Sequence, residues 1–205
     1  MTDEHHPVNI PKHTDGSWLA LVKESVGADH LVPVHVKVKV SNEFDASLEI
    51  KGAKPGSIVV LMRGFEHVST RNKVVSPKLE DILDPQAPDK LNPTTLGYRG
   101  VLAGKPFEIR QRYGRGAKPN EKQGQPYHVV LRWQGQSQVL CRVEGGCDEC
   151  GWRLIWAGDL DGDGEPDLLM AQEIGMYDEK YSLFLSTRRG KGELVASVSY
   201  DSASD

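Results

Sequence analysis

The amino-acid sequence predicts an all-β protein, built as an antiparallel β-sandwich or a barrel-like meander. Apolar and polar residues alternate in several short runs, which is the periodicity of a half-buried strand. Turn-forming residues separate these runs at intervals of about eight to twelve residues. No segment sustains the apolar period of about 3.6 residues that marks an amphipathic helix. Strands expected to pair in sequence order, roughly ten to thirteen of them, favour a meander.

Length and composition limit the organisation of the chain. Its 205 residues suffice for one domain with a sizeable core, and we predict a single β-rich domain over 17–200 behind a flexible tether, 1–16. An apolar content of 38% and a charged content of 26% are ordinary for a soluble protein. The net charge of −4 and the lack of a basic stripe predict no nucleic-acid partner. No apolar run approaches about eighteen residues, so no transmembrane segment is expected.

The first strands are expected in the N-terminal third of the chain. Residues 18–22 form a short apolar run, and residues 34–40 show the clearest alternation, with valines on one face. His35 lies on the other face, which predicts a solvent-facing side chain rather than a ligand. Residues 47–50 predict another strand. The continuously apolar residues 58–62 predict a central strand that is covered on both faces.

Two long loops are expected in the middle of the chain. Residues 76–95 are polar, acidic and interrupted by four prolines, with one helical turn over 79–83. A loop of this length is usually either mobile or functional. Residues 114–125 lack apolar periodicity and form either a solvated loop or a contact surface for an acidic partner. Four residues make this second loop locally basic: Arg112, Arg115, Lys118 and Lys122.

The remaining strands are expected in consecutive hairpins. Residues 96–102 and 107–113 are followed by the pair 127–133 and 137–143, which turns about Gln134, Gly135 and Gln136. Trp152, Leu154 and Trp156 alternate with other residues, so their side chains are expected on one face, in the core. The last predicted strands are 168–171, 181–186 and 193–200.

Three cysteines lie within ten residues of one another: Cys141, Cys147 and Cys150. Their odd number allows one local disulfide with a free thiol. Plain thiols are the second reading. A metal site is the third, although no fourth ligand lies nearby in the sequence.

Carboxylates stand at the first, third, fifth and ninth positions of the stretch 159–167, and Gly164 occupies the sixth. A calcium ion takes six to eight oxygen ligands at about 2.3–2.6 Å and tolerates irregular geometry. Carboxylates this close would repel one another strongly in an empty loop. The stretch therefore predicts a calcium site, in which the ion braces the structure. An acidic turn that binds nothing and a catalytic or sensing ion are the alternatives.

The acidic stretch differs from an EF-hand, because Met170 stands at the twelfth position, where an EF-hand has glutamate. With Trp-Ala-Gly before it and Leu-Leu-Met after it, it resembles the calcium loop of FG-GAP/VCBS or integrin-α-type proteins, which joins two antiparallel strands. The resemblance implies a calcium hairpin over 152–172. It implies side-chain oxygens from four aspartates and a backbone carbonyl from Glu165. The aspartates are Asp159, Asp161, Asp163 and Asp167.

The propellers of that family repeat the loop, whereas this sequence carries one copy. A single loop near the C-terminus also resembles uncharacterised bacterial proteins that are often exported. This resemblance favours a periplasmic or secreted protein, with residues 1–16 as a mature N-terminus that lacks a signal peptide. A cytoplasmic protein is the alternative.

Sequence motifs of catalysis are missing. The chain has no nucleophile elbow, no phosphate-binding loop and no His-Glu-x-x-His motif. We therefore expect a non-enzymatic protein of the bacterial cell envelope that acts by contacting another protein, in the format of an inhibitor or an immunity protein against a secreted toxin. The alternative is a hydrolase of an envelope polymer, with its site in loops 76–95 and 114–125.

Overall fold

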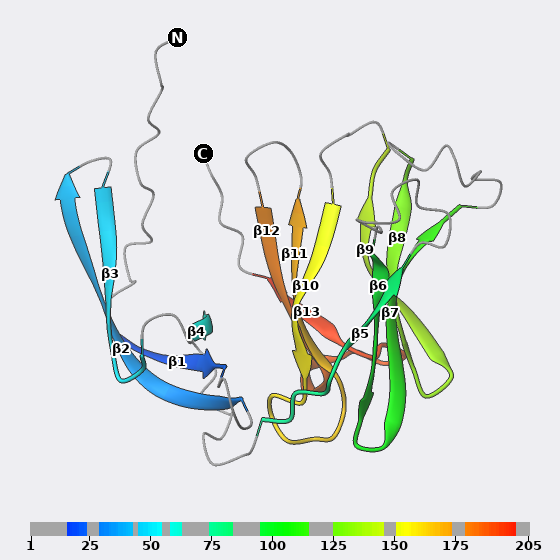
Figure 1. Ribbon diagram of the computed structural model, residues 1–205, viewed down its shortest axis with the longest axis horizontal. Helices are drawn as coiled ribbons and strands as arrows, with labels where there is room; N and C mark the ends of the chain where they lie inside the picture. Colours follow the sequence, from blue (N-terminus) through cyan, green and yellow to red (C-terminus); the bar gives the residue numbers. More distant parts are fainter. Residues whose placement is uncertain are drawn as a thin grey trace, which may run out of the picture. The chain divides into compact units, whose positions relative to one another are not determined.

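A computed structural model of the chain confirms the all-β class (Figure 1). Backbone contacts divide the chain into two compact units, residues 1–74 with 203–205 and residues 75–202, and each is described by itself. The single domain and the tether expected from the sequence stay predictions. The structure describes residues 16–23, 29–42, 45–54, 58–62, 74–83, 95–114, 125–145, 151–173 and 179–199.

The first unit holds a four-stranded antiparallel sheet with the order β3-β2-β1-β4. The alternation in β2 is confirmed, because Val34 and Val36 are buried while His35 is exposed. The buried valines pack with Ala20 and Val22 of β1 in the core of this unit. The strands are β1 (Gly16–Val22), β2 (His30–Asn42), β3 (Asp45–Lys51) and β4 (Ile58–Met62).

Strand β4 corrects one expectation. It pairs with β1 and ends the order of the sheet, so it is not a central strand among the described residues. Met62 is buried, but the four residues before it are only half-buried. Ile58 and Leu61 pack against the core cluster of this unit. A continuous apolar run reports how apolar the surroundings are, and it does not fix the pairing order.

The second unit is a sandwich of two antiparallel sheets in which all neighbours are consecutive in sequence, as a meander requires. The five-stranded sheet contains β5 (Glu80–Leu83), β6 (Thr95–Leu102), β7 (Lys105–Tyr113), β8 (Tyr127–Trp133) and β9 (Gln136–Val143). The four-stranded sheet contains β10 (Gly151–Gly158), β11 (Asp167–Glu173), β12 (Glu179–Leu185) and β13 (Ala196–Ser199).

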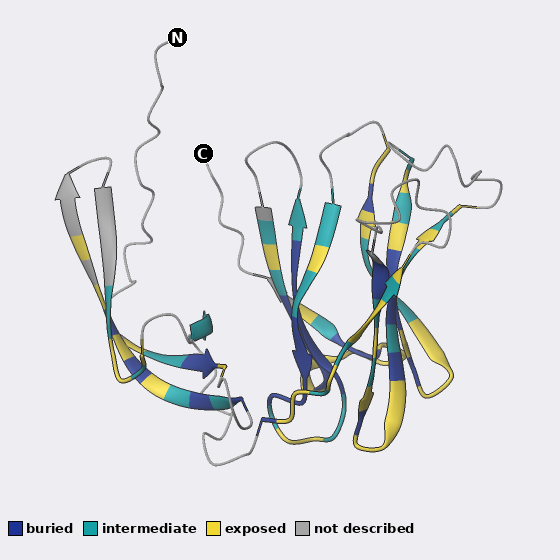
Figure 2. Cartoon of the chain, viewed as in Figure 1, coloured by how far each residue is buried: buried dark blue, intermediate teal, exposed yellow. Residues whose placement is uncertain are grey.

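Residues from both sheets form the core of the sandwich. Phe107, Ile109 and Leu131 of the five-stranded sheet share one buried cluster with Leu168 and Met170 of the four-stranded sheet. Buried residues alternate with less buried ones in β7, and in β8 the alternation is interrupted only at Val130, which is also buried (Figure 2). The strands expected over 96–102, 107–113, 127–133, 137–143 and 168–171 are confirmed.

Residues 80–83 form strand β5, so the helical turn expected over 79–83 is wrong. The strand pairs antiparallel with β6, and the exposed ion pair between Glu80 and Arg99 lies across the two strands. The edge of β6 offers backbone partners that a single helical turn lacks. The parts of the two predicted loops at 84–94 and 115–124 lie outside the described residues.

The tryptophans of β10 lie on different faces, which corrects the expectation of a shared face. The register with β11 shifts between Leu154 and Trp156, so an extra residue reverses the alternation. Trp152 and Leu154 pack against the core of the sandwich, as does Ala157 after the shift. Trp156 is also buried, but it pairs with Leu169, which is not part of that cluster.

The C-terminal hairpin is shorter than expected. A 3-10 helix, Ser186–Arg188, follows β12, and β13 begins only at Ala196. Leu194 and Val195 are both buried, so these two residues of the strand expected over 193–200 do not alternate between two faces.

Cys141 has a free thiol, whereas the pair Cys147 and Cys150 lies outside the described residues. The described residues contain no helix of the length and apolarity needed to cross a membrane.

Candidate metal centre

The acidic stretch connects two neighbouring antiparallel strands of the second unit. Strand β10 ends at Gly158 and β11 begins at Asp167, and these two residues face each other in the register. The residues between them, 159–166, form the loop, here called the aspartate loop together with Asp167. The sequence therefore placed the candidate site correctly at a hairpin connection.

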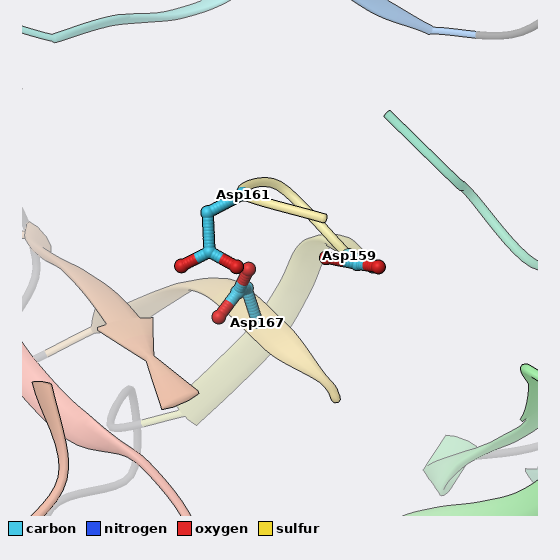
Figure 3. A group of neighbouring side chains, drawn as sticks. All are labelled: Asp159, Asp161 and Asp167. Carbon is cyan, nitrogen blue, oxygen red and sulfur yellow. The ribbon is translucent and has the colours of Figure 1, made fainter. Parts of the chain in front are cut away.

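Three aspartates converge in the aspartate loop (Figure 3). One carboxylate oxygen from each of Asp159, Asp161 and Asp167 lies within 4.8 Å of the others. Asp159 and Asp167 are buried, and Asp161 is half-buried. It is the only such cluster of ligand side chains found among the described residues, and all its donors are oxygens.

Asp159 organises the backbone of the loop. Its Oδ1 accepts hydrogen bonds from the amides of Gly162, at 2.6 Å, and Asp163, at 3.1 Å. Its Oδ2 accepts one from the amide of Gly164, at 2.9 Å. Gly162 and Gly164 have φ angles of 85° and 80°, in the left-handed region that glycine adopts at little cost. The carboxylate of Asp159 therefore stabilises the curved backbone of the loop by accepting three amide hydrogen bonds.

Asp167 is held from two sides. Its Oδ2 accepts a hydrogen bond from the amide of Leu160, at 2.8 Å, and its Oδ1 accepts one from the amide of Ser186, also at 2.8 Å. The hydroxyl of Ser186 lies 3.0 Å from Asp167 Oδ1 and 2.8 Å from Asp163 Oδ2, so its single proton serves one of them at a time. Thr187 Oγ1 donates to Asp161 Oδ2 at 2.7 Å.

Sequence reasoning missed Ser186 and Thr187, which lie far along the chain from the aspartates they bind. Spacing within the motif cannot reveal residues that reach the site through strand pairing. The only available signal is their place directly after β12, which pairs with β11. The site thus joins the aspartate loop to the short 3-10 helix.

Burial sets the electrostatics of the cluster. It raises the pKa of Asp167 to about 7, against the effect of the hydrogen bonds from Ser186 and Leu160. Burial also raises the pKa of Asp161, while the hydrogen bond from Thr187 acts in the opposite direction. The three groups that donate to Asp167 are all neutral. A buried carboxylate without a positive partner is costly, so either a proton or a cation must compensate its charge.

Asp163 and Glu165 complete the five residues that the sequence singled out, and neither belongs to the cluster of three. Asp163 Oδ1 accepts a hydrogen bond from the amide of Glu165, at 2.8 Å. The carboxylate of Glu165 forms an ion pair with the guanidinium of Arg189. Ligation by Asp163 and by the backbone carbonyl of Glu165 stays a prediction.

The donor set fits a hard cation. After the hydrogen bonds described above, each carboxylate of the cluster keeps lone-pair capacity, since an ionised carboxylate has about four acceptor sites. A set of carboxylate oxygens suits calcium, magnesium or manganese better than zinc or copper. An ion here would tie β10, β11 and the residues after β12 through one centre.

The start of the second unit is fastened to the same loop. The amide and carbonyl of Val75 exchange backbone hydrogen bonds with Asp159, at 3.1 and 2.9 Å. Next to this bridge, the indole nitrogen of Trp156 donates to Ser76 Oγ at 2.9 Å. Gly158 is needed at this approach, because a Cβ there would collide with the carbonyl of Val75.

Comparisons with known proteins add no identity to this site. No protein-family model, curated protein or solved structure matches the chain. The likeness of the aspartate loop to FG-GAP/VCBS calcium loops therefore stays a prediction from spacing. What can be said of function depends on the arrangement of the residues themselves.

Proposed function

We propose that the chain is a non-enzymatic, calcium-binding β protein in which the ion braces the sandwich, and that it works by contacting another protein. One observation carries the proposal: carboxylate oxygens of Asp159, Asp161 and Asp167 lie within 4.8 Å of one another in a hairpin connection, and two of the three aspartates are buried. Such a group of like charges is stable only when a proton or a cation compensates it.

Calcium is favoured over other hard cations by the form of the loop. Magnesium demands a nearly ideal octahedron and keeps several waters, whereas calcium accepts irregular sets of six to eight oxygens. The aspartate loop offers carboxylates from alternate positions and one from the following strand, which is an irregular set. Asp163 is a ready further ligand, because its Oδ2 shares the hydroxyl of Ser186 with Asp167.

A bracing role is favoured over a catalytic one. The cluster is held by backbone amides and by two hydroxyls, those of Ser186 and Thr187. The described residues place no histidine or cysteine in it. Calcium with oxygen ligands activates water less well than zinc does. In this proposal the ion stabilises the fold, and the protein functions through contacts made by its surface.

The cell envelope of a bacterium is the proposed location, in the periplasm or outside the cell, where free calcium would keep a single site filled. An inhibitor or an immunity protein against a secreted toxin is the proposed format. This part rests on size, on the single loop and on the expectation of protein contact rather than on a catalytic motif.

Thermal and chemical unfolding with calcium and with a chelator tests the metal site. At a hundredfold excess of calcium over its Kd, binding to the folded state stabilises it by about 3 kcal/mol. We expect Asp161→Asn combined with Asp163→Asn to lose most of this gain. Asp81→Asn combined with Glu144→Gln, which removes the same charge from exposed positions of the same unit, is the matched control and should keep it.

An equal unfolding midpoint with calcium and chelator would refute calcium bracing. Loss of the gain in the control pair as well would show a general charge effect. The protein-contact part is tested separately, by capture of a partner from the source cells followed by binding measurements with the purified partner. A catalytic turnover by the isolated protein would overturn that part.

A further inference from the structure

Five arginines lie on one face of the five-stranded sheet, on the side opposite the core of the sandwich. They are named here the arginine face: Arg99, Arg110, Arg112, Arg132 and Arg142. All are exposed except Arg110, which is half-buried.

The strand register places these arginines together. Residues paired directly across neighbouring strands project from the same face. Arg99 and Arg132 both lie opposite Glu108, one from each neighbouring strand. Arg112 and Arg142 both lie opposite His128 in the same way.

Arg110 lies between these two rows. It faces Val130, and Val130 in turn faces Val139. The neighbouring residues of β7 and β8 that point the other way, such as Ile109 and Leu131, belong to the core. The arginine face is therefore a continuous surface over β6 to β9.

Five arginines outnumber the acidic residues that the described strand pairs place on this face, which are Glu80 and Glu108. Arg99 forms an ion pair with Glu80, at 2.9 Å. The other four arginines form no ion pair with any described residue of the chain. The whole chain has a net charge of −4, so positive charge is concentrated here against an acidic background. Such a patch attracts a surface of opposite charge.

Apolar side chains lie beside the arginines at the two edges of the sheet. Val139 of the edge strand β9 is 44% exposed and pairs with the buried Val130, and Ile82 of the opposite edge strand β5 is half-buried. Arginines next to apolar side chains are common in protein interfaces. Guanidinium groups also bind carboxylates through two parallel hydrogen bonds.

Nucleic acid fits this face less well than protein. Proteins that bind single strands on a sheet offer aromatic side chains on which bases stack. Among the described residues, those paired with the arginines on this side of the sheet include no phenylalanine, tyrosine or tryptophan. The partner chemistry that fits best is therefore an acidic protein surface.

We propose that the arginine face is the docking surface of the chain and that its partner is an acidic protein. This inference rests on the proposed function, since it names the surface through which the protein contact would be made. It adds the chemistry of the partner, with carboxylates over the arginines. The regular geometry of the sheet holds these side chains at fixed spacing, so binding needs little ordering of the backbone.

Binding of a fluorescein-labelled peptide of about twenty glutamates, followed by anisotropy at low salt, tests the surface. Arg112→Gln combined with Arg142→Gln should weaken binding by about tenfold or more. Lys37→Gln combined with Lys39→Gln, which removes the same charge from exposed positions of β2, should change binding by less than about twofold. Arg112→Lys combined with Arg142→Lys should give an intermediate affinity, because lysine keeps the charge and loses the paired hydrogen bonds.

Equal weakening by the β2 pair would overturn the assignment of the surface, because charge alone would then explain binding. Tighter binding of a DNA duplex or of heparin than of the glutamate peptide, with the same dependence on Arg112 and Arg142, would overturn the assignment to protein. Calcium-dependent unfolding is measured on every variant. A normal calcium gain with no peptide binding refutes only this inference, whereas a missing calcium gain refutes the proposed metal site.

Discussion

Two connections of the sandwich reverse the chain between antiparallel strands by different physical means. The turn from β8 to β9 uses Gln134 and Gly135, with φ angles of 48° and 79°. Two left-handed residues match the twist of a hairpin, so backbone conformation shapes this turn and no carboxylate takes part. The aspartate loop is shaped by carboxylates that gather backbone amides. A turn built on backbone preference needs no ion, whereas a loop built on buried carboxylates needs a proton or a cation to compensate their charge.

A neutral and an ionisable side chain can also be compared where each forms hydrogen bonds with backbone groups far along the chain. Gln138 Oε1 accepts hydrogen bonds from the amides of Leu194, at 2.5 Å, and Val195, at 2.9 Å, and its Nε2 donates to the Val195 carbonyl at 2.7 Å. The carboxylate of Asp167 similarly accepts hydrogen bonds from the amides of Leu160 and Ser186. The amide side chain of Gln138 is neutral, whereas the carboxylate of Asp167 can carry a charge. Only the charged one should make stability depend on calcium.

The largest expected effect on stability comes from removing the side chain of Asp167 or Gln138. Asp167→Ala should lower the free energy of unfolding in calcium by about 3 kcal/mol, because it leaves buried amides without acceptors and removes a ligand. Gln138→Ala should cost about 2 kcal/mol, and equally with calcium or with chelator. Urea unfolding of both variants in both conditions measures this. A calcium-dependent cost for Gln138→Ala would erase the contrast.

A second expectation concerns ionisation in the hairpin of β8 and β9. Burial raises the pKa of the Cys141 thiol from 9.0 to about 11. Because the unfolded thiol ionises at lower pH, the contribution of Cys141 to stability is present below pH 9 and is lost as the pH rises towards 11. At pH 9 the folded protein should be alkylated at Cys141 roughly fiftyfold more slowly than the urea-unfolded protein.

Peptide mapping by mass spectrometry separates Cys141 from Cys147 and Cys150. The rate at Cys141 should be the same with calcium and with chelator, since this hairpin does not depend on the ion. An alkylation rate in the folded protein equal to that in urea would contradict the burial of this thiol.

The smallest expected effect compares two glycines. Gly135 and Gly164 both have φ near 80°, and no atom lies within 4 Å of where a Cβ would be. Each replacement by alanine should cost about 1 kcal/mol through backbone strain. For Gly135→Ala this cost should be independent of calcium. For Gly164→Ala it should be larger in calcium, because the Gly164 amide orients Asp159. Differential scanning calorimetry in both conditions measures the difference, and equal costs would show that the glycine does not affect the ion.

Local patterns predicted local structure. The alternation of valines predicted β2, and the spacing of aspartates predicted that Asp159, Asp161 and Asp167 converge. Both depend on interactions between residues close in sequence, or on burial of one face. A pattern of this kind carries its own geometry, because strand and loop backbones fix where successive side chains point.

The structural features that the sequence did not predict are determined by pairing between strands. Strand β5 forms because the edge of β6 is available, and its four residues give no sign of this. One extra residue in β10 reverses the face of Trp156, and a period of two cannot reveal such a bulge. Ser186 and Thr187 reach the aspartates only because β12 pairs with β11. All three features depend on pairing with another strand, and the local sequence does not show which strand that is.

The bridge between Val75 and Asp159 gives the aspartate loop a mechanical meaning. Val75 is the first residue of the second unit, so tension transmitted along the chain from residues 1–74 meets this bridge first. Its two hydrogen bonds are anchored on the residue that also begins the candidate metal site. A bound ion would therefore stiffen the point at which the chain enters the sandwich from residues 1–74.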